Sequence, residues 1–185
     1  MLCGTWIGQD PRGWWLSEKL NGARATWDGK YLWSRLGNRF IPPSHFTRGW
    51  PKTPIDGELW AGRGGYLAVM SAIKSPKNKT AWDGVKFVAF DIPAQALRVE
   101  DRIAALGQIK ETNTISVLSH RICTGRAGLI SELKNCYAGA AEGVVLRKSG
   151  SLYFPSSTNR DYCQEMLKVR VENNMSLVLP ALVAA

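Results

Sequence analysis

The chain has 185 residues, 45% of them hydrophobic and 21% charged, a composition that fits a globular domain with its own core and argues against a disordered or fibrous chain. Its 24 Lys and Arg residues against 15 Asp and Glu residues give a net charge of +9, which favours a polyanionic partner such as nucleic acid. The sequence shows neither a run of about 18 apolar residues nor a secretory leader, so we expect an intracellular protein without a membrane partner, cytoplasmic if its source is a bacterium or a phage.

Strand patterns dominate the first third of the chain. Apolar and aromatic residues gather at positions 14–16, 23–27 and 31–34, and Asn21-Gly22 and Asp28-Gly29 separate these runs. Asn-Gly and Asp-Gly between such runs are typical of two-residue hairpin turns, so we expect consecutive antiparallel strands here. Residues 39–54 are rich in Pro and aromatic residues, which predicts an irregular connection, and residues 55–60 return to strand.

The rest of the chain mixes strands with helices. Apolar positions 99, 103 and 106, and again 129, 133 and 136, follow the helical spacing of four and then three residues, and Gly139 is expected to end the second helix. Apolar runs over residues 86–92, 115–119, 143–146 and 166–171 predict further strands. The pattern predicts an α+β fold of antiparallel sheets flanked by helices.

Residues 18–24 read Glu-Lys-Leu-Asn-Gly-Ala-Arg and place a lysine beside a glycine turn. A lysine amine attacks only when it is neutral, and with an ordinary pKa of about 10.4 it is almost wholly protonated at pH 7. Nearby cations, a metal ion or desolvation favour the neutral form. Lys19 is therefore a candidate nucleophile if the site supplies such groups, and a surface lysine on a turn is the alternative.

Three carboxylates lie within or at the ends of predicted apolar strands, namely Glu58, Asp91 and Glu142. A carboxylate in such a place must be paired, hydrogen-bonded or bound to a cation, because an unpaired buried charge is costly. Mg²⁺ held by one or two carboxylates and substrate phosphates is one solution, and an ion pair with an arginine is the other.

Two cations share one face of the last predicted strand. Lys168 and Arg170 alternate with Leu167 and Val169, so they should point to the side opposite the apolar residues. Two cations on one face suit a phosphate and disfavour protonation of a neighbouring lysine. A solvated edge strand protected by its charges is the alternative.

Other familiar sites are missing from the sequence. It contains no phosphate-binding loop of the Gly-x-x-x-x-Gly-Lys-Ser/Thr kind, which excludes a P-loop enzyme. The four cysteines, Cys3, Cys123, Cys136 and Cys163, lack metal-ligand spacing. We expect them to be reduced thiols without a catalytic role.

Taken in order, these segments resemble the motifs of the covalent nucleotidyltransferases, and specifically the adenylation domain of small ATP-dependent DNA ligases of bacterial and phage type. The match rests on six segments: residues 19–24 (Lys-x-x-Gly and Arg24), 34–37 (Ser-Arg-Leu-Gly), 56–59 (Asp-Gly-Glu-Leu), 90–91 (Phe-Asp), 142–145 (Glu-Gly-Val-Val) and 167–170 (Leu-Lys-Val-Arg). The resemblance implies an ATP-grasp-like nucleotidyltransferase domain over residues 1–172.

The resemblance also implies a reaction and roles for residues. Lys19 would attack the α-phosphate of ATP and carry AMP, which would pass to the 5′-phosphate of nicked double-stranded DNA before a 3′-hydroxyl displaces it, as in DNA replication, repair and recombination. The implied ATP or AMP contacts are Glu18, Arg24, Glu58, Lys168, Arg170 and Phe90, the last of these stacking on adenine. Arg35 would lie near the nick phosphate, and Glu142 and Glu58 would serve Mg²⁺ or Mn²⁺.

The chain departs from the family pattern at two places. Asn21 stands where the family has aspartate; it replaces a carboxylate by a neutral amide, although asparagine tolerates the positive φ expected of the turn. Residues 173–185 form an apolar tail where family ligases continue into an oligonucleotide-binding (OB-fold) barrel, so no C-terminal OB-fold is expected. A partner that supplies such a domain, an RNA ligase or other nucleotidyltransferase, and an impaired nucleotide- or nick-binding module remain alternatives.

Overall fold

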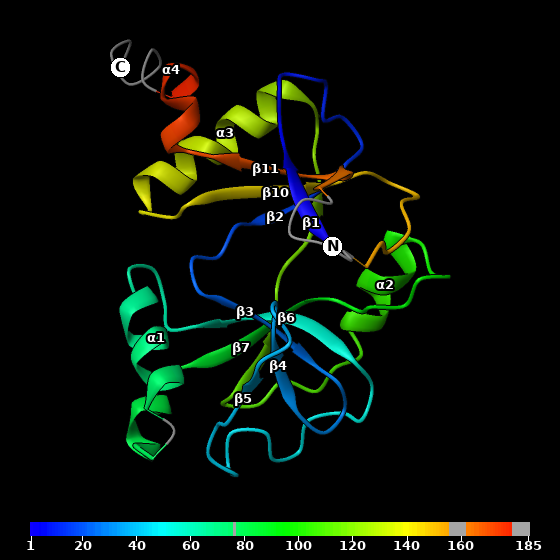
Figure 1. Ribbon diagram of the computed structural model, residues 1–185. Helices are drawn as coiled ribbons and strands as arrows, with labels where there is room; N and C mark the ends of the chain where they lie inside the picture. The colour runs from blue at the N-terminus through cyan, green and yellow to red at the C-terminus, as the bar shows by residue number, and fades with distance from the viewer. Residues whose placement is uncertain (76, 156–161, 179–185) are drawn as a thin grey trace. The chain divides into compact units, whose positions relative to one another are not determined.

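The computed structural model describes residues 1–75, 77–155 and 162–178, and the chain forms two compact units (Figure 1). Unit 1 comprises residues 1–20, 94–101 and the chain from residue 119, and unit 2 comprises residues 21–93 and 102–118. Each unit has its own sheet and its own hydrophobic core. The predicted α+β class is confirmed.

Unit 1 contains a five-stranded sheet in the order β1-β11-β10-β2-β9. Its strands are β1 (Leu2–Thr5), β2 (Trp15–Glu18), β9 (Arg121–Ile122), β10 (Gly143–Arg147) and β11 (Tyr162–Arg170). β1 runs parallel to β11, and the other neighbours are antiparallel. All five residues of β10 are buried, because β11 and β2 flank the strand and helix α3 (Arg126–Ala138) packs against it.

The chain of unit 1 ends, within the described residues, in a 3-10 turn (Glu172–Asn174) and helix α4 (Met175–Val178). Val178 is fully buried in the same core as Leu129 and Leu133 of α3. The first part of the predicted apolar tail therefore contributes to the core of unit 1. Residues 179–185 of that tail lie outside the described residues.

Unit 2 contains a six-stranded sheet in the order β5-β4-β3-β6-β7-β8. Its strands are β3 (Ala23–Trp27), β4 (Leu32–Ser34), β5 (Arg39–Phe40), β6 (Ile55–Trp60), β7 (Lys86–Asp91) and β8 (Ile115–Val117), with helix α1 (Tyr66–Lys74) and a 3-10 turn (Lys79–Trp82) beside them. β7 and β8 are parallel and the other pairs antiparallel. Helix α2 (Val99–Leu106) is divided between the units at Asp101.

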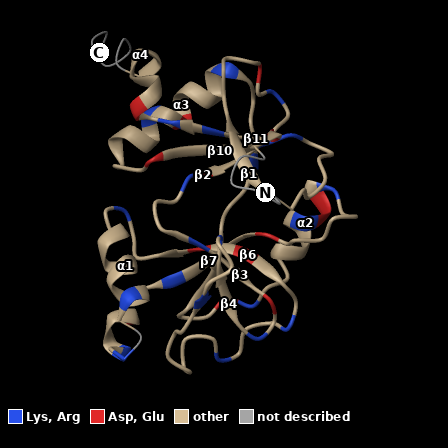
Figure 2. Cartoon of the chain, in the orientation of Figure 1, with Lys and Arg blue, Asp and Glu red and all other residues tan. Residues whose placement is uncertain are grey.

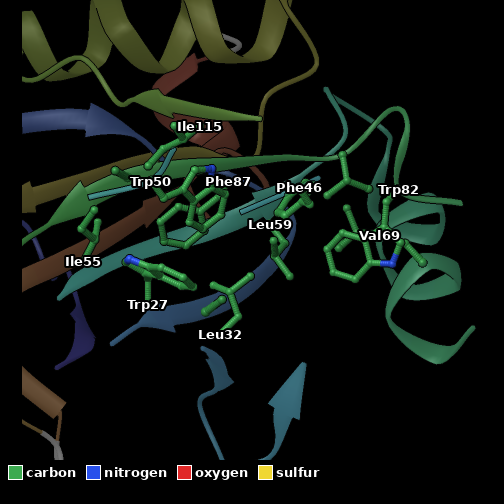
Figure 3. Close-up of a cluster of buried hydrophobic side chains, with 14 of the residues drawn as sticks. Trp27, Leu32, Phe46, Trp50, Ile55, Leu59, Val69, Trp82, Phe87 and Ile115 are labelled. Carbon is green, nitrogen blue, oxygen red and sulfur yellow. The ribbon is translucent and has the colours of Figure 1, made fainter. Parts of the chain in front are cut away.

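The core of unit 2 combines aliphatic side chains with several packed aromatic rings (Figure 3). The rings of Trp50 and Phe87 stack with centroids 5.0 Å apart, and Phe46 meets Trp82 edge-on at 4.8 Å. Such pairs add about 0.5–1.5 kcal/mol each beyond the burial of their apolar area. The Pro-rich connection 39–54, predicted to be irregular, supplies Phe46 and Trp50 to this core.

The hairpin predicted at Asp28-Gly29 is confirmed. It joins β3 and β4, and Gly29 has φ 98°, a value that favours glycine. The Asp28 carboxylate accepts hydrogen bonds from Lys30 N at 2.7 Å, Tyr31 N at 2.6 Å and Trp33 Nε1 at 2.6 Å. Partial burial raises the pKa of Asp28, but these hydrogen bonds outweigh it and the net pKa is lowered.

The hairpin predicted at Asn21-Gly22 is wrong. β2 pairs with β10 and β9, whereas β3 pairs with β4 and β6, so the two strands belong to different sheets. Neither Asn21 nor Gly22 is among the described residues with positive φ. The backbone N–H of Gly22 instead donates to Glu58 Oε1 at 3.1 Å, and this side-chain acceptor from β6 takes the place of a turn hydrogen bond.

The sequence patterns did not predict β1, β5, β9, α1 or α4. β5 and β9 have two residues each and α4 has four, too few for a period to appear. None of the described helices has the length and hydropathy needed to cross a bilayer.

Candidate active site

Lys19 follows directly after β2. Its backbone N–H donates to Gly143 O at 2.8 Å, which extends the β2–β10 ladder by one step. The ladder thereby brings Lys19 opposite the start of β10, beside Glu142. Its ammonium group donates to Glu142 Oε2 at 2.7 Å, and the two side chains are only 21% and 19% exposed.

Glu142 is held between two cations. Its Oε2 accepts from Lys19, and its Oε1 lies 2.9 Å from Nε of Arg170 on β11. The next residue must be glycine, because Gly143 has φ 147° and a Cβ there would lie 2.1 Å from the carbonyl oxygen of Val169. The Glu-Gly pair of the sequence thus combines a charged side chain, paired with two cations, with a close approach of two strands.

Strand β11 alternates as predicted. Leu167 and Val169 are buried at 0% and 1% exposure, while Lys168 and Arg170 are half-buried. The Lys168 ammonium lies 5.7 Å from the centre of the Tyr162 ring, an attractive cation–π arrangement. The predicted cationic face of this strand is therefore present, and Arg170 joins it to Glu142 and Lys19.

In unit 2, Arg24 on β3 is paired with Asp56 on β6. The Arg24 Nε lies 3.1 Å from Asp56 Oδ1, its Nη2 contacts Oδ2, and Asp56 is fully buried. Thr26 also donates to Asp56 Oδ1, at 3.3 Å. The arginine fork is thus fixed by a buried carboxylate, and its guanidinium lies 5.8 Å from the centre of the Phe90 ring.

The remaining predicted site residues lie on strands, except Arg35, which lies in a turn. Glu58 is the register partner of Arg24 on the neighbouring strand, and Phe90 lies half-buried on β7. Arg35 is exposed in the turn between β4 and β5, where Ser34 Oγ accepts from Asn38 N at 3.0 Å. Glu18 ends β2 in unit 1, half-buried and opposite Val144.

Asp91, one of the three strand carboxylates, makes an ion pair with an arginine, the alternative to metal binding. Arg102 Nε donates to Asp91 Oδ1 at 2.7 Å, and both side chains are buried. The signal for this partner was present in the sequence, since Arg102 follows Val99 by three residues and so lies on the apolar face of α2. The sequence analysis also did not identify Asp56 as the ion-pair partner of Arg24.

Within the described residues, no group of three or more His, Cys, Asp and Glu side chains is arranged to hold a metal ion. A site for Mg²⁺ does not require such a group, because the ion commonly binds through one or two carboxylates and the phosphates of a substrate. Glu142 is partly exposed, and its two oxygens contact Lys19 and Arg170, so a metal ion bound there would have to displace or share with one of these cations.

The comparisons with known proteins find similarity to DNA ligases. No family model matches the chain. A DNA ligase of Haemophilus influenzae is 33% identical over 156 residues, which are 83% of this chain and 58% of that protein. The chain thus spans 58% of the length of this curated relative.

Two solved structures have a similar fold. A structure from an analysis of Lig E DNA ligases, described as DNA binding with a minimal scaffold, has a TM-score of 0.81 and 29% identity and covers 91% of this chain and 68% of its own. The Chlorella virus DNA ligase-adenylate, with a TM-score of 0.71 and 18% identity over 91% of this chain and 66% of its own, shares the fold. The chain is therefore similar in sequence to a DNA ligase and shares its fold with two DNA ligases of known structure.

Proposed function

We propose that this chain is the catalytic domain of an ATP-dependent DNA ligase that acts on nicked double-stranded DNA. The observation that carries the proposal is the position of Lys19 Nζ, 2.7 Å from Glu142 and beside the cationic face of β11. The similarity to the Haemophilus influenzae DNA ligase and to the Lig E structure supports the choice of substrate.

In the first step, Lys19 Nζ gives a proton to Glu142 Oε2, its hydrogen-bond partner, and attacks the α-phosphorus of ATP. A nitrogen–phosphorus bond forms while the bond from the α-phosphorus to the bridging oxygen breaks. Pyrophosphate leaves with the electron pair and takes up the second proton that the nitrogen loses. AMP is then carried on Lys19, moves to the 5′-phosphate of the nick, and leaves when the 3′-hydroxyl attacks.

The surrounding cations suit a reaction that depends on positioning and neutralising phosphate charge. Lys168 and Arg170 contact the phosphates of the nucleotide in this proposal, and Glu18 supports the strand end that carries Lys19. Arg35, exposed in its turn, is assigned to the nick phosphate.

The adenosine part of the nucleotide is assigned to unit 2. Phe90 stacks on adenine, and Arg24 and Glu58 contact the ribose or phosphates. The buried Asp56 supports this assignment, because it fixes the Arg24 guanidinium near the Phe90 ring.

A divalent ion, Mg²⁺ or Mn²⁺, is assigned to Glu142, with Glu58 as a second candidate ligand. When bound, such an ion would neutralise charge on the triphosphate and favour departure of pyrophosphate. The protein side chains would still bind the nucleotide, orient Nζ and accept its proton.

Labelling with ATP that carries ³²P at the α-phosphate tests the first step. The wild-type chain with Mg²⁺ should acquire an acid-labile label, and Lys19→Ala should abolish it. Lys148→Ala is the matched control, because Lys148 is also an amine near a carboxylate, Glu165 at 3.5 Å, but is 54% exposed, and its label should be unchanged. Label retained in Lys19→Ala would refute the assignment of the nucleophile.

Nick-sealing assays distinguish a DNA ligase from an RNA ligase. Matched nicked DNA and nicked RNA duplexes should show sealing of DNA, and preference for RNA would favour the RNA ligase alternative. Addition of a separate OB-fold protein that stimulates sealing would identify a partner for the domain, whereas label without sealing under every condition would favour the impaired module.

A further inference from the structure

Two of the four cysteines are direct neighbours in the sheet of unit 1. Cys3 on β1 and Cys163 on β11 are register partners in the parallel pair, although 159 residues lie between them in sequence. Both pack against one small cluster formed by Met1, Val145, Tyr153 and Met166. Their side chains therefore point to the same face of the sheet, side by side.

The spacing of neighbouring strands allows a bond between these thiols. Strands lie about 4.8 Å apart, and the Cα atoms of disulfide-bonded cysteines are usually about 4.4–6.8 Å apart. Cβ atoms separated by the full strand spacing exceed the usual mean of about 3.8 Å, so a bond here would be formed with some strain. Strained disulfides are more easily reduced, which suits a reversible link.

The four thiols differ in access. Cys3 and Cys163 are partly exposed, whereas Cys123 and Cys136 are buried. The two buried thiols donate to the carbonyl oxygens of Gly125 and Gly143, each at 3.4 Å. Thiol–disulfide exchange with a dissolved disulfide requires access to the sulfur atom. Cys3 and Cys163 should therefore react before Cys123 and Cys136.

We propose that Cys3 and Cys163 form a redox-sensitive site, which closes to an intramolecular disulfide in the presence of a small-molecule disulfide such as oxidised glutathione. One thiolate attacks the glutathione disulfide, forms a mixed disulfide and releases one glutathione. The second thiolate attacks the protein sulfur of that mixed disulfide and releases the other glutathione. The two protein thiols lose two electrons and two protons in total, and one oxidised glutathione becomes two reduced molecules.

The bond would fasten an edge strand. Among the described strands β1 ends the order of its sheet, with β11 as its neighbour, and its pairing shifts register directly after Cys3. β11 continues from Cys163 to Lys168 and Arg170. Closure therefore ties β1 covalently to the strand that carries the cationic face, independently of the proposed ligase function.

Alkylation after equilibration with mixtures of reduced and oxidised glutathione tests the site. At oxidising ratios the intact chain should accept two alkyl groups in place of four after denaturation, and peptide mapping should join Cys3 to Cys163. The link should disappear at reducing ratios. In Cys3→Ser or Cys163→Ser, the remaining partner should carry glutathione as a mixed disulfide, with Cys123 and Cys136 still reduced.

Hydrogen exchange completes the test. Amides of β1 should exchange more slowly in the oxidised chain than in the reduced one, while those of β10 should not change. The proposal is overturned by mixed disulfides on both residues without a link, by a link to Cys123 or Cys136, by no reaction at strongly oxidising ratios, or by unchanged exchange in β1 after the link has formed.

Discussion

The carboxylate of Glu142 contacts a cation at each of its oxygens, Lys19 at one and Arg170 at the other. We therefore expect the proposed reaction to depend strongly on this residue. Glu142→Gln removes the proposed proton acceptor and the negative charge while keeping the side-chain shape. We expect the rate of self-adenylation, measured with labelled ATP in single turnover, to fall about 10²-fold or more, the usual contribution of a positioned acid–base group.

Glu172→Gln is the control for that experiment. Glu172 also contacts Arg170, at 3.3 Å from its Nη1, but is 68% exposed, and exposed ion pairs contribute about 1 kcal/mol or less. The rate of self-adenylation of Glu172→Gln should differ from that of the wild type by less than about threefold. Equal losses in both variants would mean that Arg170, and not the Lys19–Glu142 contact, controls the step.

Asn21 is the residue at which the chain departs from the Lys-x-Asp-Gly motif that residues 19–22 resemble, and it is exposed. Asn21→Asp restores a carboxylate two residues after Lys19 without a change of size. If the amide limits the reaction, the variant should seal nicks faster, whereas Asn21→Ala should gain nothing. Quenched-flow assays of the separate steps would show which of them responds. Equal rates for the wild-type chain and the Asn21→Asp variant would remove this residue as the cause of any impairment.

At the level of elements, Glu100 connects the start of α2 to two other segments of unit 1. Its carboxylate accepts from Trp15 Nε1 at 3.2 Å and from Gly150 N at 3.0 Å. Partial burial raises the pKa of Glu100, but hydrogen bonds from its own N–H, Gly150, Trp15 and Ser149 outweigh it, and the net pKa is lowered from 4.5.

A lowered pKa implies a defined dependence of stability on pH. The ionised Glu100 stabilises the fold above the unfolded-state pKa, and this contribution is lost as the pH falls through the lower folded-state pKa. Glu100→Gln should therefore reduce the free energy of unfolding at pH 7, by about 1 kcal/mol, and by progressively less below pH 4.5. Urea unfolding across this range measures the effect. A difference between wild type and Glu100→Gln that grows on acidification would contradict the assignment.

The same elements show what a sequence can and cannot predict. The alternation of Lys168 and Arg170 with buried Leu167 and Val169 was predictable because it depends on neighbours in the chain. The pairing of Arg24 with Asp56 depends on the register between β3 and β6, and such register is set by long-range packing. The prediction of a turn at Asn21-Gly22 was wrong for the same reason, because β2 and β3 pair with strands of two different sheets.

At the scale of the whole molecule, the charge is unevenly divided. Unit 2 contains 13 Lys and Arg residues and six Asp and Glu residues. The chain assigned to unit 1 contains 11 Lys and Arg residues and nine Asp and Glu residues. Figure 2 marks the Lys and Arg positions in blue and the Asp and Glu positions in red. Unit 2 thus carries seven of the nine net positive charges. If DNA phosphates are neutralised by this excess, binding should release counterions mainly through unit 2.

Two triple variants test where the phosphate contacts lie. Lys30, Arg35 and Arg39 are exposed around the β3–β4–β5 hairpins of unit 2, and Arg12, Arg98 and Arg126 are exposed in unit 1. Each lost phosphate contact should lower the slope of log affinity against log salt by about 0.9. Changing all three unit 2 residues to Gln should therefore flatten the slope for a nicked duplex, measured by fluorescence anisotropy, more than the matched change in unit 1. Because both variants lose the same charge, equal slopes would show that net charge alone, and not its concentration in unit 2, governs DNA binding.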